Sequence, residues 1–434
     1  MSSVSFNQDS SSLAFCTGQG YHLFTSKNVQ SGTLERLHFD DSVQHVQIAE
    51  RLFTSNLVAL VDRENPCSLR LCHFLKGSEI CRYSYPSNIL SVRLNQRRLI
   101  VCLVDQYCIH DIRNMVQQHV IHDSVCNPKG LCALSVASET ALIGYPGSDQ
   151  QGVLIVFDAL LMAQTLELDA HNSPLAAIAF SQKADLIATA STKGTVIRTF
   201  STDTGDKLHE LRRGMKRCVS ISCLAFSQDG VFLAASSNTE TVHIFNLFHK
   251  LEKPSTEGWV DYLSSAVTAS AASLIPATIS TALNALRAFA TARLSTEGNK
   301  TVTAIVSVKG LPYIVVADEN GLVHIFKLNA EEGGECELLS TKRLESPGCD
   351  EELEGQELER QVTVSAETFQ TEQTIRDATY AYKLKQEKKD GPSTNSERLN
   401  EIVDNVTACD TDKEDAGTQI INLNDSQEFP PMSS

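Results

Sequence analysis

Two adjacent arginines, Arg212 and Arg213, are the residues of this chain whose type and spacing best suit a defined chemistry. They lie in the segment LRRGMKRC, residues 211–218, between two stretches rich in apolar residues. Successive side chains of an extended strand point to opposite sides, so the two guanidinium groups would enter two separate pockets. Because a guanidinium forks onto phosphate oxygens, the pair predicts two neighbouring phosphate-binding sites. The alternative interpretation is a solvated basic loop.

Polar residues flank the two arginines on both sides. Arg198 precedes Arg212 by one strand and turn, so both can line one groove, and the adjoining strand and turn offer hydroxyl groups and a close backbone approach at Thr189, Ser191, Lys193, Gly194 and Thr195. After Arg213, the next pair of strands carries Ser237, Thr241 and His243. A pocket of one arginine, several hydroxyls and a ring nitrogen suits a phosphate, which carries about −1.5 to −2 charge. A lone strand histidine, by contrast, is more often structural.

These residues sit within an internal repeat. Its unit is an apolar strand, a turn, an Ala/Ser-rich strand, a polar turn and a strand that ends in apolar residues. The clearest copies are residues 175–200, 222–245 and 302–326, and weaker copies are residues 4–24, 43–74, 89–112 and 131–157. About seven units at roughly 40-residue spacing predict an all-β fold, a seven-bladed, WD-repeat-like β-propeller, although the Trp-Asp dipeptide of many such repeats is missing.

The repeat is interrupted at about residues 250–300, a stretch too long for a propeller turn. It contains the single tryptophan, Trp259, and, beyond Pro276, apolar residues at helical spacing, namely Ile279, Leu283, Leu286 and Ala290, with Phe289 beside them. The spacing predicts an amphipathic helix of low charge. A helix that inserts into a membrane surface, a helix packed on the propeller and a disordered insertion are the open alternatives.

The charge of the chain is concentrated at its C-terminal end. Residues 330–434 carry 25 acidic and 10 basic side chains, so they account for −15 of the net charge of −16. We therefore expect a folded propeller over residues 1–329 and a disordered acidic tail over residues 330–434. The near-neutral folded part can carry a local basic patch.

Motifs of enzymes and metal sites are missing from the sequence. The 13 cysteines contain no CxxC pair, and no phosphate-cradling GxxxxGK[ST], GxSxG or HExxH motif is present. We therefore expect no catalytic residue, no bound metal and no cofactor. Nucleic-acid binding is disfavoured because the basic residues are too few and too local. The start of the chain lacks a signal sequence, and no apolar run reaches the length of a membrane span, so a cytosolic protein with reduced thiols is expected.

The segment Leu211-Arg212-Arg213-Gly214 resembles the Phe-Arg-Arg-Gly signature of the PROPPINs, β-propellers that bind polyphosphoinositides. The downstream run SSNTETVHIF, residues 236–245, and the long segment before the last repeat occur in the same order as in the animal WIPI branch of that family. The resemblance covers about residues 4–328. Leu211 stands where the family usually has Phe, and we expect its side chain to pack into the blade.

The resemblance implies two lipid-binding sites on the rim, one for each arginine. The first site would use Thr189, Ser191, Gly194, Thr195, Arg198, Arg212 and His171. The second would use Arg213, Ser236 or Ser237, Thr239, Thr241 and His243, with Gly214 completing the signature. A membrane-inserting loop would lie around residues 259–294, with Trp259, Ile279, Leu283, Leu286 and Phe289 as its apolar residues.

The resemblance also implies a function in autophagy. PROPPINs bind phosphatidylinositol 3-phosphate and phosphatidylinositol 3,5-bisphosphate and bring other factors to forming autophagosomes. One expected partner is a coiled-coil conjugation factor, which a second basic group, Arg93, Arg97 and Arg98, could contact unless these residues form a solvated turn. We expect a monomer in solution that acts peripherally on autophagosomal and endosomal membranes. The alternative is a propeller scaffold that assembles proteins without lipid.

Overall fold

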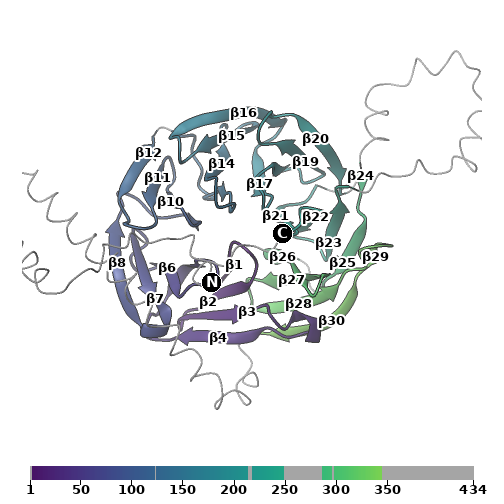
Figure 1. Ribbon diagram of the computed structural model, residues 1–434, viewed down its shortest axis with the longest axis horizontal. Helices are drawn as coiled ribbons and strands as arrows, with labels where there is room; N and C mark the ends of the chain where they lie inside the picture. The colour runs from purple at the N-terminus through teal and green to yellow at the C-terminus, as the bar shows by residue number, and fades with distance from the viewer. Residues whose placement is uncertain (1, 123, 214–217, 249–285, 296–297, 345–434) are drawn as a thin grey trace, which may run out of the picture.

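The structure, a computed structural model, describes residues 2–122, 124–213, 218–248, 286–295 and 298–344. These residues form seven sheets arranged in a ring around a central axis, a seven-bladed β-propeller (Figure 1). Each blade runs from an innermost strand beside the axis to an outermost strand at the circumference, and contacts between β1 and β26 close the ring. The all-β fold and the seven repeats expected from the sequence are confirmed.

Blades 1 to 4 are each a four-stranded antiparallel sheet of consecutive strands. Blade 1 contains β1 (Ser3–Phe6), β2 (Ser12–Cys16), β3 (Tyr21–Thr25) and β4 (Glu35–Asp40); blade 2 contains β5 (Val46–Arg51), β6 (Leu57–Asp62), β7 (Ser68–His73) and β8 (Ser78–Ser84). Blade 3 contains β9 (Ser91–Leu94), β10 (Arg98–Cys102), β11 (Tyr107–Asp111) and β12 (Gln117–Ile121); blade 4 contains β13 (Ala133–Leu134), β14 (Leu142–Pro146), β15 (Gly152–Asp158) and β16 (Ala163–His171). Two short 3₁₀ turns, η1 (Val29–Ser31) and η2 (Phe74–Lys76), lie in blades 1 and 2.

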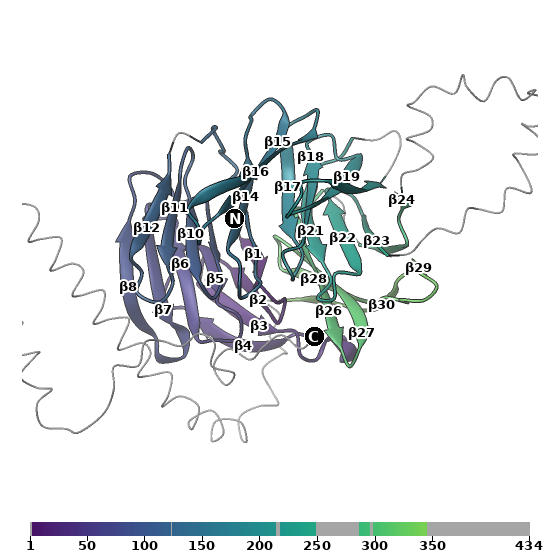
Figure 2. The same ribbon diagram turned by 45° about the horizontal axis from the view of Figure 1, so that its top comes forward.

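Blades 5 to 7 follow the same strand order, and blades 5 and 6 each carry one added strand. Blade 5 contains β17 (Leu175–Phe180), β18 (Leu186–Ser191), β19 (Val196–Ser201) and β20 (Lys207–Arg212); blade 6 contains β21 (Ile221–Phe226), β22 (Phe232–Ser237), β23 (Thr241–Asn246) and β25 (Ala290–Arg293). Blade 7 contains β26 (Thr301–Val308), β27 (Leu311–Asp318), β28 (Leu322–Lys327) and β30 (Glu337–Arg343). Two strands pair in parallel with outer edges: β24 (Leu286–Arg287) with β20, and β29 (Gly334–Glu335) with β25. Figure 2 shows both at the outer circumference.

The apolar core lies between neighbouring blades. The cluster between blades 5 and 6 joins Ala190 and Leu211 to Leu224 and Phe245, all buried. Alanines such as Ala190 in the second strand of a blade let the next sheet approach closely, and these second strands are buried along most of their length because both faces pack on neighbouring blades. This packing holds the strand ends of adjacent blades side by side, so polar residues at those ends meet across the junctions.

Two expectations from the sequence are corrected. The predicted amphipathic helix is wrong for residues 286–293, which form β24 and β25, because their backbone groups pair with the open edges of β20 and β23. The expected propeller boundary at residue 329 is also too early, since β30 pairs with β28 as the outermost strand of blade 7. The propeller thus extends to Arg343, and its last strand comes from the segment assigned to the acidic tail.

The described part of the chain contains almost no helix. Its only helical elements, η1 and η2, are single turns, and no helix there has the length and apolar character needed to cross a bilayer.

Candidate functional site

The end of β20 directs successive side chains to opposite faces of blade 5. Leu211 is fully buried in the core between blades 5 and 6, so the expectation that it packs into the blade is confirmed. Arg212, on the other face, places Nη2 3.9 Å from Glu210 Oε1. The Arg213 side chain returns toward blade 6, where Nη2 donates to Thr239 Oγ1 at 2.9 Å. The two guanidinium groups therefore diverge, as the alternation of a strand predicts.

The first cluster, consisting of His171, Thr189, Arg198, Glu210 and Arg212, spans the junction of blades 4 and 5. His171 Nε2 lies 2.9 Å from Thr189 Oγ1, and both side chains are buried. Arg198 is the cross-strand partner of Thr189 and of Glu210. Its Nη1 donates to the backbone oxygen of Ala170 at 2.6 Å, which ties blade 5 to β16 of blade 4. Four of the seven expected first-site residues are thus brought together: His171, Thr189, Arg198 and Arg212.

Glu210 is a member of this cluster that the sequence reasoning missed. Its Oε2 accepts from Arg198 Nε at 3.0 Å and from Lys207 Nζ at 3.4 Å. Burial acts to raise the pKa of Glu210, but the hydrogen bond and charge of Arg198 and the charge of Lys207 more than offset it and hold that pKa below its usual range. Glu210 is therefore ionised at neutral pH. The available signal was its position two residues before Arg212 on the same strand, which places both on one face.

The turn between β18 and β19 brings backbone groups close to the two arginines. Gly194 has a φ of +62°, and a Cβ at this position would lie 1.9 Å from the backbone oxygen of Val219. Only glycine fits that turn. The backbone N–H of Arg213 donates to the Thr195 oxygen at 3.2 Å, and the Ser191 side chain is buried at the start of the turn. Ser191, Gly194 and Thr195 therefore lie at the same end of blade 5 as the first cluster.

The second cluster, consisting of Arg213, Ser237, Thr239 and His243, lies at the junction of blades 5 and 6. Thr239 Oγ1 accepts from Arg213 and lies 2.9 Å from Ser237 Oγ, and both hydroxyl side chains are buried. His243 comes from β23 and is close enough for the charge of Arg213 to act on it. The second cluster thus presents a guanidinium, two hydroxyls and an imidazole.

Ser236 and Thr241, the other two residues expected at the second site, make contacts outside the second cluster. Ser236 Oγ lies 3.1 Å from Ser222 Oγ and donates to the Thr301 backbone oxygen at 3.5 Å, so it faces blade 7. Of the two serines left open by the sequence, Ser237 is the one that joins Arg213. Thr241 is half-buried at the start of β23, where it pairs with Arg293 of β25.

His171 and His243 are both neutral at neutral pH, because their pKa values are lowered. Burial, helped by the charge of Arg198, lowers the pKa of His171 to about 4. Burial, helped by the charge of Arg213, lowers the pKa of His243 to about 4. A neutral imidazole offers one N–H donor and one acceptor, and a bound anion would favour its protonation by offsetting the neighbouring arginine.

The expected membrane-inserting residues are only partly described. Trp259, Ile279 and Leu283 lie outside the described residues, as does Gly214 of the signature. Phe289 is half-buried, its ring centroid is 5.8 Å from that of Phe232, and its backbone N–H donates to Ile244. The helix predicted at Phe289 is therefore wrong, because the residue packs on blade 6, and its contact with a membrane stays a prediction. The backbone of Leu286 is part of β24, which corrects the helix there too.

The second basic group lies at the junction of blades 3 and 4. Arg93, Arg97 and Arg98 donate through Nε to backbone oxygens of Cys132, Ser138 and Ala159, so all three tie blade 3 to blade 4. Arg93 also pairs with Glu50 at 2.9 Å and Arg98 with Asp111 at 3.4 Å. The prediction of a solvated turn is wrong for Arg98, whose side chain is 12% exposed. These side chains are interblade contacts.

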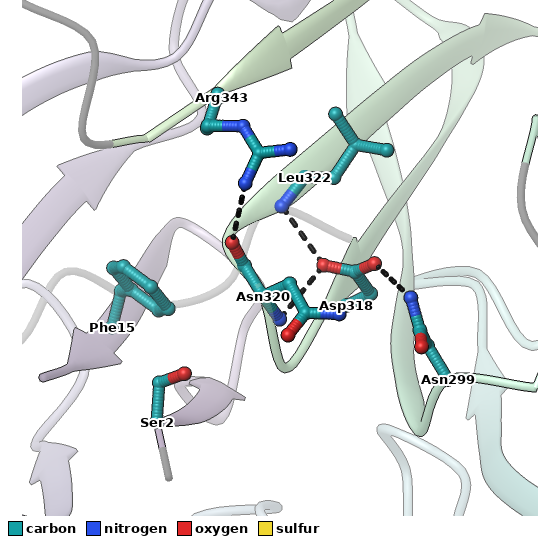
Figure 3. A pocket seen from close by; sticks show the side chains of 7 residues that line it. All are labelled: Ser2, Phe15, Asn299, Asp318, Asn320, Leu322 and Arg343. Atoms are coloured by element: carbon teal, nitrogen blue, oxygen red, sulfur yellow. Dashed lines mark hydrogen bonds between the residues drawn. The ribbon is translucent and has the colours of Figure 1, made fainter.

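A separate polar pocket of about 370 Å³ lies where blade 7 meets blade 1 (Figure 3). Its lining includes Phe15, Asn299, Asp318 and Arg343. The Asp318 carboxylate accepts from the Asn299 side chain at 2.7 Å and from two backbone N–H groups of the β27–β28 turn. This carboxylate is satisfied by its own turn, and the pocket contains none of the expected site residues. Over the described ranges, no group of three or more His, Cys, Asp or Glu could hold a metal ion.

The sequence of this chain is similar to those of a known protein family and of several relatives. The sequence profile of the PROPPIN family matches residues 1–345. WD repeat domain phosphoinositide-interacting protein 2 of Gallus gallus is 46% identical over 344 residues, covering 79% of this chain and 78% of that protein. WD repeat domain phosphoinositide-interacting protein 1 of Homo sapiens is 43% identical over 356 residues, covering 81% and 79%. Autophagy-related protein 18 of Caenorhabditis elegans is 36% identical over 350 residues, covering 77% and 84%.

Solved structures share the fold at lower identity. Kluyveromyces lactis Hsv2 with its complete loop 6CD superposes with a TM-score of 0.61 at 21% identity, covering 78% of this chain and 98% of that one. KlAtg21, solved in complex with the coiled-coil of AgAtg16, has a TM-score of 0.61 at 23% identity, with the same coverage. The family profile spans every described blade, and the arginine pair with its two clusters lies inside the matched region. This chain belongs to the PROPPIN family of β-propellers.

Proposed function

We propose that the chain is a non-enzymatic phosphoinositide effector with two rim sites for phosphatidylinositol 3-phosphate and phosphatidylinositol 3,5-bisphosphate. The first site comprises the first cluster with Ser191, Gly194 and Thr195. The second comprises the second cluster with Thr241. One observation carries the proposal: Arg212 and Arg213 are neighbours in sequence, yet their side chains join polar groups at two different blade junctions.

The chemistry of each cluster suits a phosphate monoester. A guanidinium supplies forked donors and a full charge, hydroxyls supply adaptable donors, and an imidazole can take up a proton beside the anion. Arg198 and Arg212 are each about one quarter exposed, so a ligand at the surface can reach both. Two adjacent sites on one membrane-facing edge would raise avidity by roughly 10²–10⁴ over a single site.

The names of the relatives support a cellular role in autophagy. Their names include phosphoinositide-interacting and autophagy-related proteins, which supports recruitment of autophagy factors to forming autophagosomes and peripheral action on autophagosomal and endosomal membranes. The complex of KlAtg21 with a coiled coil supports a coiled-coil partner for this chain as well. Within the second basic group, Arg93 and Arg97 are the members that such a partner can reach, because their side chains are 39% and 33% exposed.

Vesicle flotation tests the proposal. Wild type, Arg212→Ala, Arg213→Ala and the double variant are floated with vesicles that contain either lipid or neither. Each single variant should weaken binding about tenfold, as expected when one charge-assisted contact is lost, and the double variant should not float. Arg82→Gln, an exposed arginine of β8 paired with Glu79, is the control and should float like wild type.

Two outcomes would count against the proposal. Flotation of the double variant at the wild-type level would remove the arginines from the lipid site. A wild-type chain that floats with neither lipid would instead be a lipid-independent scaffold for protein assembly. Thermal unfolding of each variant should match that of wild type, which separates lost binding from lost folding.

A further inference from the structure

The short strand β24 places a third arginine beside the signature. It pairs in parallel with the end of β20, with Leu286 opposite Leu211 and Arg287 opposite Arg212. Figure 1 shows β24 just outside β20 at the circumference of the ring. Paired residues of neighbouring strands project from the same face of a sheet. Arg287 therefore emerges next to Arg212 on the face that carries the first cluster, and it is exposed.

This juxtaposition concentrates positive charge. Arg198, Lys207, Arg212 and Arg287 come together on the last strands of blade 5, and Glu210 is the carboxylate that pairs with three of them. Within the described ranges, Arg287 has no ion-pair partner of its own. Like charges directly opposite one another across a strand pair are destabilising. The excess charge is explained if this edge binds an anion.

The first cluster already accounts for one phosphate. Arg198 and Arg212 lie on either side of Glu210, close to the hydroxyl of Thr189 and the imidazole of His171. Arg287 lies beyond Arg212, on the outer side away from Arg198, because β24 is the strand outside β20. A guanidinium at that position is separated from Thr189 by two intervening strands, β19 and β20, and would meet a different phosphate of the same ligand.

We propose that Arg287 binds a second phosphate of the head group held at the first site, and so gives that site its preference for bisphosphorylated over monophosphorylated phosphoinositide. The inference rests on the proposed function and adds to it a residue that determines specificity. Capping the edge of β20 requires only the backbone of β24. Edge capping does not account for a charged side chain opposite Arg212, whereas binding of the head group does.

The test uses soluble head groups, so that attraction of the whole protein to a charged bilayer does not enter. The parent protein is the Arg213→Ala variant, which retains only the first site. It is compared with the same variant carrying Arg287→Gln in addition. Calorimetric titration compares inositol 1,3,5-trisphosphate, the head group of the bisphosphorylated lipid, with inositol 1,3-bisphosphate. The added variant should lose about threefold to tenfold in affinity for the trisphosphate and less than about twofold for the bisphosphate.

Arg82→Gln in the same parent is the charge-matched control and should change neither affinity. Equal losses of affinity for the two head groups would show that Arg287 provides only non-specific electrostatic attraction. An unchanged affinity for the trisphosphate would exclude a contact with Arg287. Either result overturns the inference. If wild type binds neither head group and floats with neither lipid, the proposed function fails and this inference fails with it. If wild type binds and only the Arg287→Gln prediction fails, the proposed function stands.

Discussion

Arg213 Nη2 lies 2.9 Å from Thr239 Oγ1, so the residue that follows β20 of blade 5 is bonded to the β22–β23 turn of blade 6. Its neighbour Arg212 remains with Glu210 on the other side of blade 5. Two consecutive residues therefore make contacts at two different blade junctions. The orientation of each arginine depends on partners that can be changed one at a time.

Removal of the Thr239 hydroxyl tests the anchoring of Arg213. Thr239→Val keeps the shape of the side chain but loses the contacts to Arg213 and Ser237. Binding to vesicles with phosphatidylinositol 3-phosphate should weaken about threefold to tenfold, and the free energy of unfolding should fall by about 1–2 kcal/mol. Thr204→Val, at an exposed turn of blade 5, is the matched control in flotation and denaturant unfolding. Lipid affinity equal to that of the control would show that Arg213 needs no anchor.

Gly194→Ala should be far more costly than the same change at another turn. At Gly194 the added Cβ combines a positive φ with a 1.9 Å approach to the Val219 oxygen. Gly230 has a φ of +76° and no heavy atom within 4 Å of such a Cβ. We expect a loss of about 1–2 kcal/mol for Gly230→Ala and about 1–3 kcal/mol more for Gly194→Ala, measured by denaturant unfolding. Equal losses would mean that the turn moves away from Val219 at no cost.

Acid should destabilise the fold through His171 and His243. Burial and the neighbouring arginines lower the pKa of each to about 4, below the value of about 6.5 in the unfolded chain. The unfolded chain therefore binds more protons between these values, and stability falls as pH decreases from 6.5 toward 4. The two residues should account for a loss on the order of 2–4 kcal/mol between pH 7.5 and pH 5.

Denaturant unfolding of wild type and of the His171→Gln, His243→Gln double variant at both pH values isolates this effect. The variant loses the Thr189 contact of His171 at either pH, so the comparison is between the changes with pH and not between the absolute stabilities. A variant that loses as much stability as wild type on acidification would assign the pH dependence to other buried histidines, such as His110 and His324.

Phe289→Ala should act on stability and leave head-group binding unchanged. The ring packs against Phe232 at the outer edge of blade 6, and we expect a loss of about 1–3 kcal/mol in the free energy of unfolding. Phe248→Ala in the same blade is the control, because that ring is 69% exposed and should contribute less than about 0.5 kcal/mol. A Phe289→Ala protein as stable as this control, but poorer in vesicle flotation, would return Phe289 to the role of a membrane-inserting residue.

The propeller and the divergence of the arginines could be predicted from the sequence because both depend on local order. A repeated alternation of apolar and polar residues specifies strands and their buried faces without reference to distant parts of the chain. The same period of two places Leu211 in the core and sends Arg212 and Arg213 to opposite sides. Polar residues at corresponding positions of consecutive repeats then meet wherever two blades touch.

Helical spacing misled for residues 286–293 because periodicity says nothing about which strand edges are open. Leu286 and Ala290 fit one face of a helix, yet the unpaired edges of β20 and β23 offered their backbone groups a better set of hydrogen bonds. The contacts of Arg93, Arg97 and Arg98 with blade 4 could not be predicted either, because blade 4 presents the accepting carbonyl oxygens from a distant part of the chain.

By itself, the sequence determined the type of fold, the number of blades and the direction of each signature side chain, since these follow from the geometry of a single strand. Only the tertiary structure decided that Arg198 ties blade 5 to blade 4, that Ser237 and not Ser236 joins Arg213, and that Arg287 stands opposite Arg212. The physical reason is that contacts between segments far apart in the chain depend on which edges and faces folding leaves available, and no local pattern encodes them.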